Sequence, residues 1–403
     1  MAIRYNLLMV SHGQRGSASS QKQKEDNPVE PELIDSQTVS QFECKISGIE
    51  IAPGETRAIL LKVSESFLST AISIPVTVIR GWRDGPTAFV TAAVHGDEIN
   101  GIDIVRRLMF EVDPKKLSGT LIAIPVVNIP GFLEQSRYLP YHRDLNRFFP
   151  GKKKGNNAER IAWKIFKEVI SKCDFGIDLH TAARGRLNLP HVRGDMSHPM
   201  VRTLARAFDT TIIMHHKGLR GSLRKEATRA GVPTILFEAG ETGKFSHRIS
   251  GAGFRGVISV LAEMGMLKKD EKKEAPFQVI VKSSEWIRAE KGGILDLDVK
   301  PGDLTYKGDT IGSVLNPFGK TVVEIKAPAT GIIVGVTTEP LTIPGTGIIH
   351  LARLKKTLAF VERSLRRRKR LDEEKMNLKR RQKDLKSKLK KKKLVLKKAG
   401  RTK

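Results

Sequence analysis

The sequence predicts an α/β protein with a doubly wound, mainly parallel sheet, followed by a small all-β domain and a basic helical tail. Two observations lead to this prediction. Short apolar runs alternate with helical patterns from residue 87 to residue 266, which is the order that βαβ units produce. From Phe277 onwards, strand-like runs are separated by Gly and Pro at close spacing, as in all-β domains.

The N-terminal elements are predicted in the following order. Residues 1–42 are rich in Gln, Ser, Lys, Glu and Pro, so we expect a flexible lead segment. The first folded domain is placed at 43–267. It begins with short strands at 46–51, 58–63 and 74–79, a main strand at 87–94 and a helix at 99–110.

A near-continuous apolar run at 120–127 is typical of a strand that is buried on both faces. The long segment that follows has no clear periodicity, and a loop of this length in a compact domain usually serves a function. Further predicted elements are a helix at 157–172, a strand that ends at His180, a helix at 199–208, strands at 210–214 and 232–237, and a helix at 249–266.

A charged linker at 268–274 separates the first domain from a β domain predicted at 275–352. The turns at 299–303 and 326–331 resemble those of lipoyl and biotinyl domains. Those domains carry an acceptor lysine with an adjacent Met on a hairpin, and this sequence lacks it. We therefore predict no covalent cofactor.

The tail at 353–403 is predicted to be helical or disordered, and it holds most of the charge of the protein. It contains 24 Lys and Arg against 5 Asp and Glu, which is +19 of the total +28. The other 352 residues carry only +9. An anionic partner such as RNA, the ribosome or an acidic membrane surface is one interpretation of the tail, and a solvated basic helix is the other. The positive charge of the tail therefore gives no information about the function of the folded domains that precede it.

The sequence also gives expectations about membrane insertion, cellular location and the role of the cysteines. No stretch approaches eighteen consecutive apolar residues, so no transmembrane helix is expected. The apolar patch at 1–10 is too short for a signal core, and we expect a cytoplasmic protein. Cys44 and Cys173 lie far apart in the sequence, outside any Cys-x-x-Cys spacing, and are expected to be inert packing residues.

His95 and Glu98 lie in the turn between the predicted strand at 87–94 and the helix after it. Sites in open α/β sheets form at this edge, where the strands end. His180 ends another predicted strand and is the best candidate for the third ligand of a catalytic zinc site, which would leave one position open for water. Gly96 and Gly101 permit close approach of the backbone.

Amide hydrolysis also needs a base that activates water. Glu238 ends the predicted strand at 232–237, on the same edge of the sheet as His95 and His180, and is the candidate base. Glu241 is the competing candidate, three residues further along in the loop.

Four segments together resemble the succinylglutamate desuccinylase/aspartoacylase family, relatives of the zinc carboxypeptidases. The resemblance covers roughly residues 45–350 and implies a sheet of zinc carboxypeptidase type. It also implies one zinc ion per chain, held by His95, Glu98 and His180, with Glu238 as general base and later general acid. The four segments are His-Gly-Asp-Glu-Ile-Asn-Gly at 95–101, Arg-Asp-Leu-Asn-Arg-Phe-Phe-Pro-Gly at 143–151, Asp-Leu-His at 178–180, and Phe-Glu-Ala-Gly at 237–240.

The resemblance also assigns substrate contacts. Asn146 and Arg147 match the pair that grips the substrate carboxylate, a role that suits the planar fork of Arg. Arg137 is chosen as the arginine that polarises the scissile carbonyl, with Arg143 as the alternative. Arg224 matches a second substrate arginine.

The function expected from these residues is zinc-dependent hydrolysis of the amide bond of a small anionic N-acyl amino acid. One alternative is a metallocarboxypeptidase that acts on a peptide or a glutamylated protein. A second is an RNA- or ribosome-associated basic protein with a vestigial metal site, which the presence of His95, Glu98, His180 and Glu238 in order disfavours.

Overall fold

A computed structural model describes residues 44–66, 68–269, 277–319, 321–354, 357–367, 370 and 376. The predicted lead segment, 1–42, lies outside the described residues, and so does most of the predicted tail.

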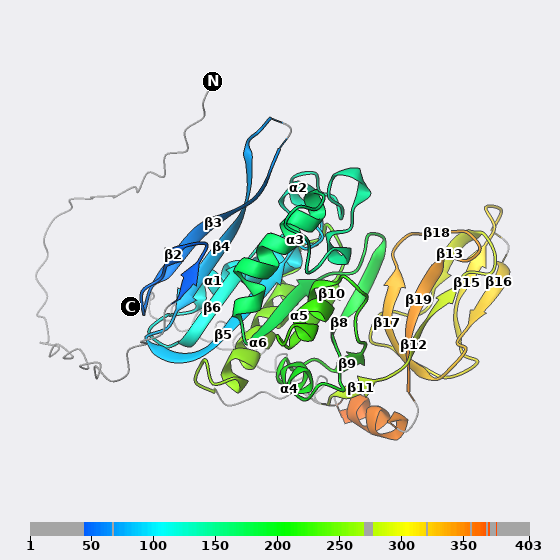
Figure 1. Ribbon diagram of the computed structural model, residues 1–403. Helices are drawn as coiled ribbons and strands as arrows, with labels where there is room; N and C mark the ends of the chain where they lie inside the picture. The colour runs from blue at the N-terminus through cyan, green and yellow to red at the C-terminus, as the bar shows by residue number, and fades with distance from the viewer. Residues whose placement is uncertain are drawn as a thin grey trace, which may run out of the picture. The chain divides into compact units, whose positions relative to one another are not determined.

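Four parallel strands form the centre of the main sheet, in the order β10-β7-β5-β6. Three of them, β10, β5 and β6, are labelled in Figure 1. These strands are β5 (Arg83–Ala92), β6 (Ser118–Ile124), β7 (Phe175–His180) and β10 (Thr234–Gly240). All residues of β7 are buried, as its apolar sequence predicts for a strand inside a two-sided sheet. The carboxyl ends of β5, β7 and β10 therefore meet at one edge.

The sheet is mixed, which corrects the prediction of a mainly parallel one. On one side, β4 (Ala71–Arg80) runs antiparallel to β6, and β3 (Thr56–Glu65) runs antiparallel to β4. On the other side, β8 (Arg186–Gly194) runs antiparallel to β10. Strand β8 was absent from the prediction because charged and polar residues interrupt its apolar ones. Strand β9 (Ile212–His215) then pairs parallel to β8.

Helices cover both faces of the sheet, as a doubly wound arrangement requires. One hydrophobic core lies between the sheet and α1, α4 and α6, and a second lies under α3 and α5. The helices of the first domain are α1 (Asn100–Glu111), α2 (Ile129–Leu133), α3 (Asn157–Glu168), α4 (Pro199–Ala207), α5 (Leu223–Arg229) and α6 (His247–Glu263), with short 3-10 turns at Pro140–His142, Leu145–Arg147 and Ile170–Lys172.

The predicted boundary at 268–274 is not a break in the sheet. Beyond it, β11 (Val279–Val281) pairs with β9, and β17 (Gly331–Thr337) pairs antiparallel to β8. A separate sheet of the order β16-β15-β13-β18 completes the β domain. The other strands of the described chain are β1 (Lys45–Ile46), β2 (Ile49–Glu50), β12 (Ser284–Arg288), β13 (Gly293–Leu297), β14 (Leu304–Thr305), β15 (Thr310–Leu315), β16 (Thr321–Lys326), β18 (Leu341–Thr342) and β19 (Gly347–Arg353).

The first part of the predicted tail is folded. Residues 358–367 are helical, and Val361 is fully buried in a cluster that includes β-domain residues such as Ile332 and Val334. Leu358 and Leu365 pack against the same cluster. The compact part of the chain thus extends beyond the predicted limit at residue 352.

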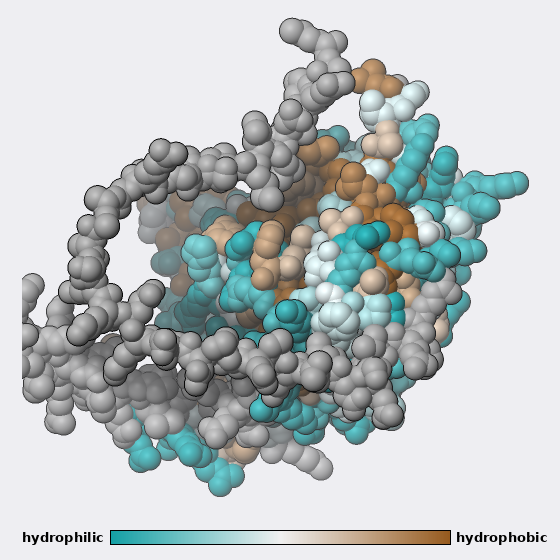
Figure 2. All heavy atoms as spheres, turned by 90° about the vertical axis from the view of Figure 1, so that its left-hand side faces the viewer, coloured by the Kyte–Doolittle hydropathy of each residue, from teal (hydrophilic) through white to brown (hydrophobic). Residues whose placement is uncertain are grey.

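Strand β3 is an edge strand of the main sheet. The side of the molecule that carries β3 faces the viewer in Figure 2, and hydrophobic and hydrophilic residues are mixed on it. Leu60 on β3 and Leu68 in the hairpin that follows are 75% and 85% exposed.

Within the described part of the chain, none of the helices combines the length and the apolar character that a membrane span requires.

Candidate active site at the carboxyl ends of the central strands

The turn after β5 is tightly packed at its glycines. A Cβ atom at Gly96 would overlap with the backbone at Gly131 and Phe132, and one at Gly101 would lie 2.9 Å from the Cβ of Ala92. These contacts confirm the expectation that both glycines permit close approach. The turn thereby presents His95 and Glu98 next to the end of β7, where His180 lies.

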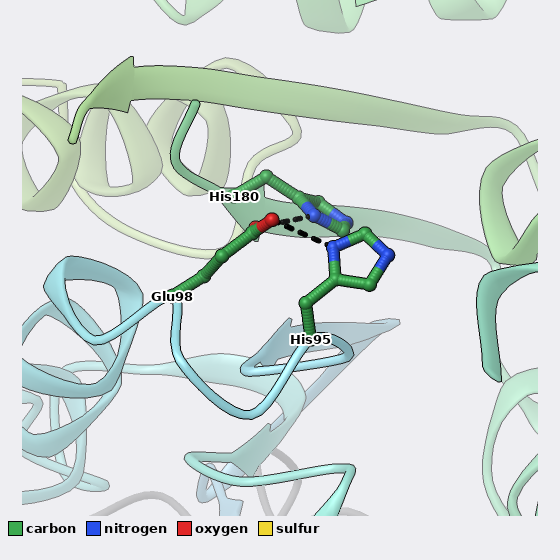
Figure 3. A group of neighbouring side chains, drawn as sticks. All are labelled: His95, Glu98 and His180. Atoms are coloured by element: carbon green, nitrogen blue, oxygen red, sulfur yellow. Dashed lines mark hydrogen bonds and ion pairs between the residues drawn. The ribbon is translucent and has the colours of Figure 1, made fainter. Parts of the chain in front are cut away.

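Three buried side chains converge at this point, as Figure 3 shows. Nδ1 of His95 lies 2.7 Å from Oε1 of Glu98, and Nδ1 of His180 lies 2.8 Å from Oε2 of the same carboxylate. The backbone N–H of Thr181 also donates to Oε2, at 3.0 Å. One ligand atom from each of the three side chains falls within 4.8 Å of the others.

A carboxylate holds the far nitrogen of each imidazole. Nε2 of His180 lies 2.8 Å from Oδ2 of Asp178, and Nε2 of His95 lies 3.0 Å from Oδ1 of Asp144. Thr91 donates its hydroxyl hydrogen to the other oxygen of Asp178. Because a carboxylate accepts and does not donate, each Nε2 carries a hydrogen, and each Nδ1 is aimed at Glu98.

The protonation of this cluster follows from its charges. Burial, the strongest single influence, lowers the pKa of His180, but Asp178 and Glu98 together raise it well above its ordinary value. The pKa of His95 is raised in the same way, by Glu98 and Asp144 against burial. Burial raises the pKa of Glu98, but the two histidines outweigh it and the net shift is downward. These shifts favour protonated imidazoles beside an ionised Glu98, so the positive charges of the rings balance the negative charge of the carboxylate.

The donor set fits a divalent metal ion. Two imidazole nitrogens and one carboxylate are a common zinc ligand set, and the carboxylates behind the histidines are the partners that metal-binding histidines usually have. A cation at this point would replace the protons on the two Nδ1 atoms, since an imidazole nitrogen must lose its proton to bind a metal.

A cavity of about 230 Å³ opens beside the cluster, and it brings together every residue predicted for the site. It is small compared with the ~300–1,000 Å³ of typical ligand pockets. The predicted residues in its wall are His95, Glu98, His180, Glu238, Arg137, Asn146, Arg147 and Arg224.

The structure separates Glu238 from its competitor. Glu238 pairs in register with His180 across β10 and β7, and its carboxylate lines the cavity. Glu241 is absent from the cavity wall, and its carboxylate contacts Lys244 at 2.9 Å and the hydroxyl of Thr338 at 2.9 Å.

Arg137 and Arg143 also differ in position. The guanidinium of Arg137 donates to Oε1 of Glu98 at 3.1 Å and to Oδ2 of Asp144 at 3.2 Å, and it lines the cavity. Arg143 lies over the ring of Tyr141 and lines a different pocket. Of the two candidates, only Arg137 is beside the metal-ligand cluster.

Asn146 and Arg147 come from the 3-10 turn Leu145–Arg147. The side-chain oxygen of Asn146 accepts from the backbone N–H of Leu223 at 2.8 Å, so it caps α5. The amide group of Asn146 and the guanidinium of Arg147, which is 41% exposed, remain at the cavity.

Arg224, on α5, is a buried cation that donates from Nη1 to the backbone oxygen of His216 at 2.7 Å. Its Nε atom is buried without a hydrogen-bond partner. Burial and the nearby Arg193 lower its pKa to about 10, so it stays charged at neutral pH. A buried guanidinium with an unused donor is the partner that a substrate anion needs.

The sequence prediction missed several residues of the site. Asp178 shares a strand face with His180 because it lies two residues earlier, a signal that was available. Asp144 had no comparable signal, since only the folded loop brings it to His95. Strand β8 contributes Arg186, Asn188 and Arg193 to the cavity wall, and the β domain contributes Trp286.

Comparison with known proteins shows similarity to one family of amide-cleaving enzymes over the part of the chain that carries this site. The profile described as the succinylglutamate desuccinylase/aspartoacylase catalytic domain matches residues 84–264. The chain is also 28% identical over 277 residues to the N-alpha-acetyl-L-2,4-diaminobutyric acid deacetylase of Halomonas elongata, a match that covers 65% of this chain and 80% of that protein.

Two solved structures share the fold. A succinylglutamate desuccinylase from Silicibacter has a TM-score of 0.68 and 21% identity, over 82% of this chain and all of the other. The ectoine utilization protein EutE (DoeB) of Ruegeria pomeroyi has a TM-score of 0.67 and 23% identity, over 74% of this chain and 95% of the other. Residues 84–264 of the chain are thus similar to the catalytic domain of the succinylglutamate desuccinylase/aspartoacylase family.

Proposed function

We propose that this protein is a zinc-dependent hydrolase that removes the acyl group from a small, anionic N-acyl amino acid. One observation carries the proposal: a metal-ligand cluster, a carboxylate outside that cluster and several arginines line the same small cavity. Relatives with deacetylase and desuccinylase names support amide cleavage as the reaction.

His95, Glu98 and His180 would hold the zinc ion. When bound, zinc supplies Lewis acidity, which polarises a carbonyl oxygen and makes water more acidic. Asp178 and Asp144 fix the ring orientation of the two histidines, so both Nδ1 atoms stay directed at one point.

Glu238 is the proposed base. It lies opposite His180 in the sheet and faces the cavity, where its carboxylate can accept a proton from water as the water attacks the acyl carbon. The same group then returns that proton to the departing amine. Arg137, beside Glu98, would stabilise the negative charge that develops on the carbonyl oxygen.

The charges of the wall favour an anionic substrate. Five arginines face the cavity against two carboxylates, Glu98 and Glu238. The arginines are Arg137, Arg147, Arg186, Arg193 and Arg224. Arg147 and Arg224 are proposed to bind the carboxylates of the substrate, and Asn146 its polar groups. A cationic side chain, such as that of diaminobutyrate, would be repelled by this wall.

The test is a hydrolysis panel with the zinc-loaded protein. Acidic, neutral and basic N-acyl amino acids, including N-acetyl-2,4-diaminobutyrate, and short peptides would be incubated and the released amine measured. We expect acidic substrates to have the highest kcat/KM. Preference for the diaminobutyrate compound would overturn the substrate class, and release of C-terminal residues from peptides alone would establish the carboxypeptidase alternative.

A further inference from the structure

Both carboxylate oxygens of Glu238 have a partner on strand β8. The amide nitrogen of Asn188 donates to Oε1 at 3.0 Å, and Nε of Arg193 lies 3.4 Å from Oε2. Asn188 is buried, and its hydrogen bond is the shorter of the two contacts. Neither residue was expected at the site from the sequence.

A β-bulge brings Asn188 to this position. Glu238 pairs with His191 and Gly240 pairs with Asn188, so between these pairs one residue on β10 faces two on β8. Without the extra residue, Leu189 would oppose Gly240 and an apolar side chain would take the place of the amide. Residues that oppose each other in a sheet point to the same face, so the bulge places Asn188 beside Glu238.

His191 stabilises the bulge from inside. It is fully buried, and its Nδ1 donates to the backbone oxygen of Leu189 at 2.7 Å, while its Nε2 accepts from Nε of Arg193 at 2.9 Å. The backbone carbonyl of Leu189, inside the bulge, thus has a side-chain hydrogen-bond partner. This histidine thus connects the irregular backbone to Arg193, one of the two residues that contact Glu238.

The β domain closes the other side of Asn188. Strand β17 pairs with β8, and Gly335 lies directly opposite Asn188. A Cβ atom at Gly335 would overlap with Oδ1 of Asn188. The carboxamide therefore lies between Gly335 and Glu238, and a methyl group at residue 335 would push it out of place.

We infer that Asn188 is a positioning residue for Glu238, and that Gly335 of the β domain is required to hold Asn188 in place. The inference rests on the proposed role of Glu238 as base. A carboxylate that must accept a proton from water and return it to an amine has to point at one place, and a single carboxyl group on a two-carbon stem has several rotamers. The amide of Asn188 selects one of them.

Three substitutions test the inference by steady-state kinetics on the N-acyl amino acid that the wild-type protein hydrolyses fastest. Asn188→Ala should lower kcat by about 10- to 100-fold, the range for loss of a hydrogen bond to a charged group, while KM changes by less than about threefold. Gly335→Ala should have a similar effect, although residue 335 does not touch Glu238. Gly292→Ala is the matched control, because a Cβ there meets nothing closer than 3.5 Å, and it should match wild type.

A double-mutant cycle separates positioning from general loss of structure. In a Glu238→Gln background, Asn188→Ala should lower the residual rate by less than about threefold, since the group that it positions is already gone. Equal losses in both backgrounds would overturn the inference. A normal kcat for Asn188→Ala, measured with unchanged zinc content, would also overturn the inference.

A crystal structure of Asn188→Ala supplies a readout that does not depend on turnover. The Glu238 carboxylate should occupy a different rotamer, or more than one, and zinc should still be bound. If the wild-type protein hydrolyses no substrate of the panel, the proposed function fails. The crystal structure of Asn188→Ala would then still decide whether Asn188 orients Glu238. A Glu238 carboxylate in its wild-type position would refute the positioning role of Asn188.

Discussion

Nε2 of His180 lies 2.8 Å from Oδ2 of Asp178, two residues earlier on the same strand, while its Nδ1 faces Glu98. Asp178 is fully buried and is itself held by Thr91. A zinc site built on His180 therefore depends on a residue that never touches the metal.

The first prediction concerns metal affinity. Asp178→Asn should weaken zinc binding by about 10- to 100-fold, because the imidazole loses the charged partner that fixes its orientation. His180→Ala should abolish stoichiometric zinc. Competition with a chelating dye measures both, and Asp296→Asn, at an exposed position of β13, is the control. One equivalent of zinc in His180→Ala would show that the ligand assignment is wrong.

The second prediction concerns the base. Glu238→Gln should fold and bind zinc, yet lose about 10²- to 10⁴-fold in kcat, because an amide cannot accept the proton of water. Glu241→Gln should remain close to wild type, since Glu241 contacts Lys244 and Thr338 away from the cavity. The reverse pattern in the two variants would transfer the role of base to Glu241.

The third prediction concerns Arg224. Its replacement by Met should raise KM for an acidic substrate by about 10- to 100-fold, the loss expected for hydrogen bonds to a charged group. Thermal stability should not fall, because the substitution removes a buried charge whose Nε has no partner. A melting temperature well below wild type, with KM unchanged, would instead assign Arg224 a structural role.

The fourth prediction concerns pH. The pKa values of His95 and His180 are raised in the metal-free protein, so protons compete for the site above the ordinary histidine value of about 6.5. Zinc affinity should therefore still increase between about pH 6.5 and 8, by about tenfold per unit for each proton displaced. The stability that protonation gives the metal-free form has the opposite trend, present below about pH 6.5 and lost as the pH rises through the raised values. Calorimetric titration at several pH values measures the affinity, and a constant value over this range would contradict the prediction.

The fifth prediction concerns the tail. Ending the chain after Met376 should leave kcat/KM within a few-fold, because the proposed zinc ligands, base and substrate-binding residues all lie in the cavity wall and charges are screened beyond about 8 Å at physiological salt. Val361→Ala, in the packed part of the tail, should instead destabilise the protein by about 2 kcal/mol. A shortened protein that folds and binds zinc but is inactive would place the tail at the active site.

The sequence by itself determined the central strands and the residues that end them. Apolar runs stopped at His180 and Glu238, and a strand followed by a turn presented His95 and Glu98, because parallel strands bring their carboxyl ends to one edge. These local patterns were sufficient for the ligand cluster, and the glycines of the turn fitted the close packing observed there.

Tertiary structure alone decided the rest of the site. Strand β8 has no clean alternation, and its bulge shifts which residues face the cavity, so no periodic pattern could place Asn188 beside Glu238. Asp144 reaches His95 only because a long loop folds back over the strand ends, and Gly335 reaches Asn188 only because β17 joins the main sheet. Such contacts join residues far apart in the chain, and their geometry depends on packing that the intervening sequence does not encode locally.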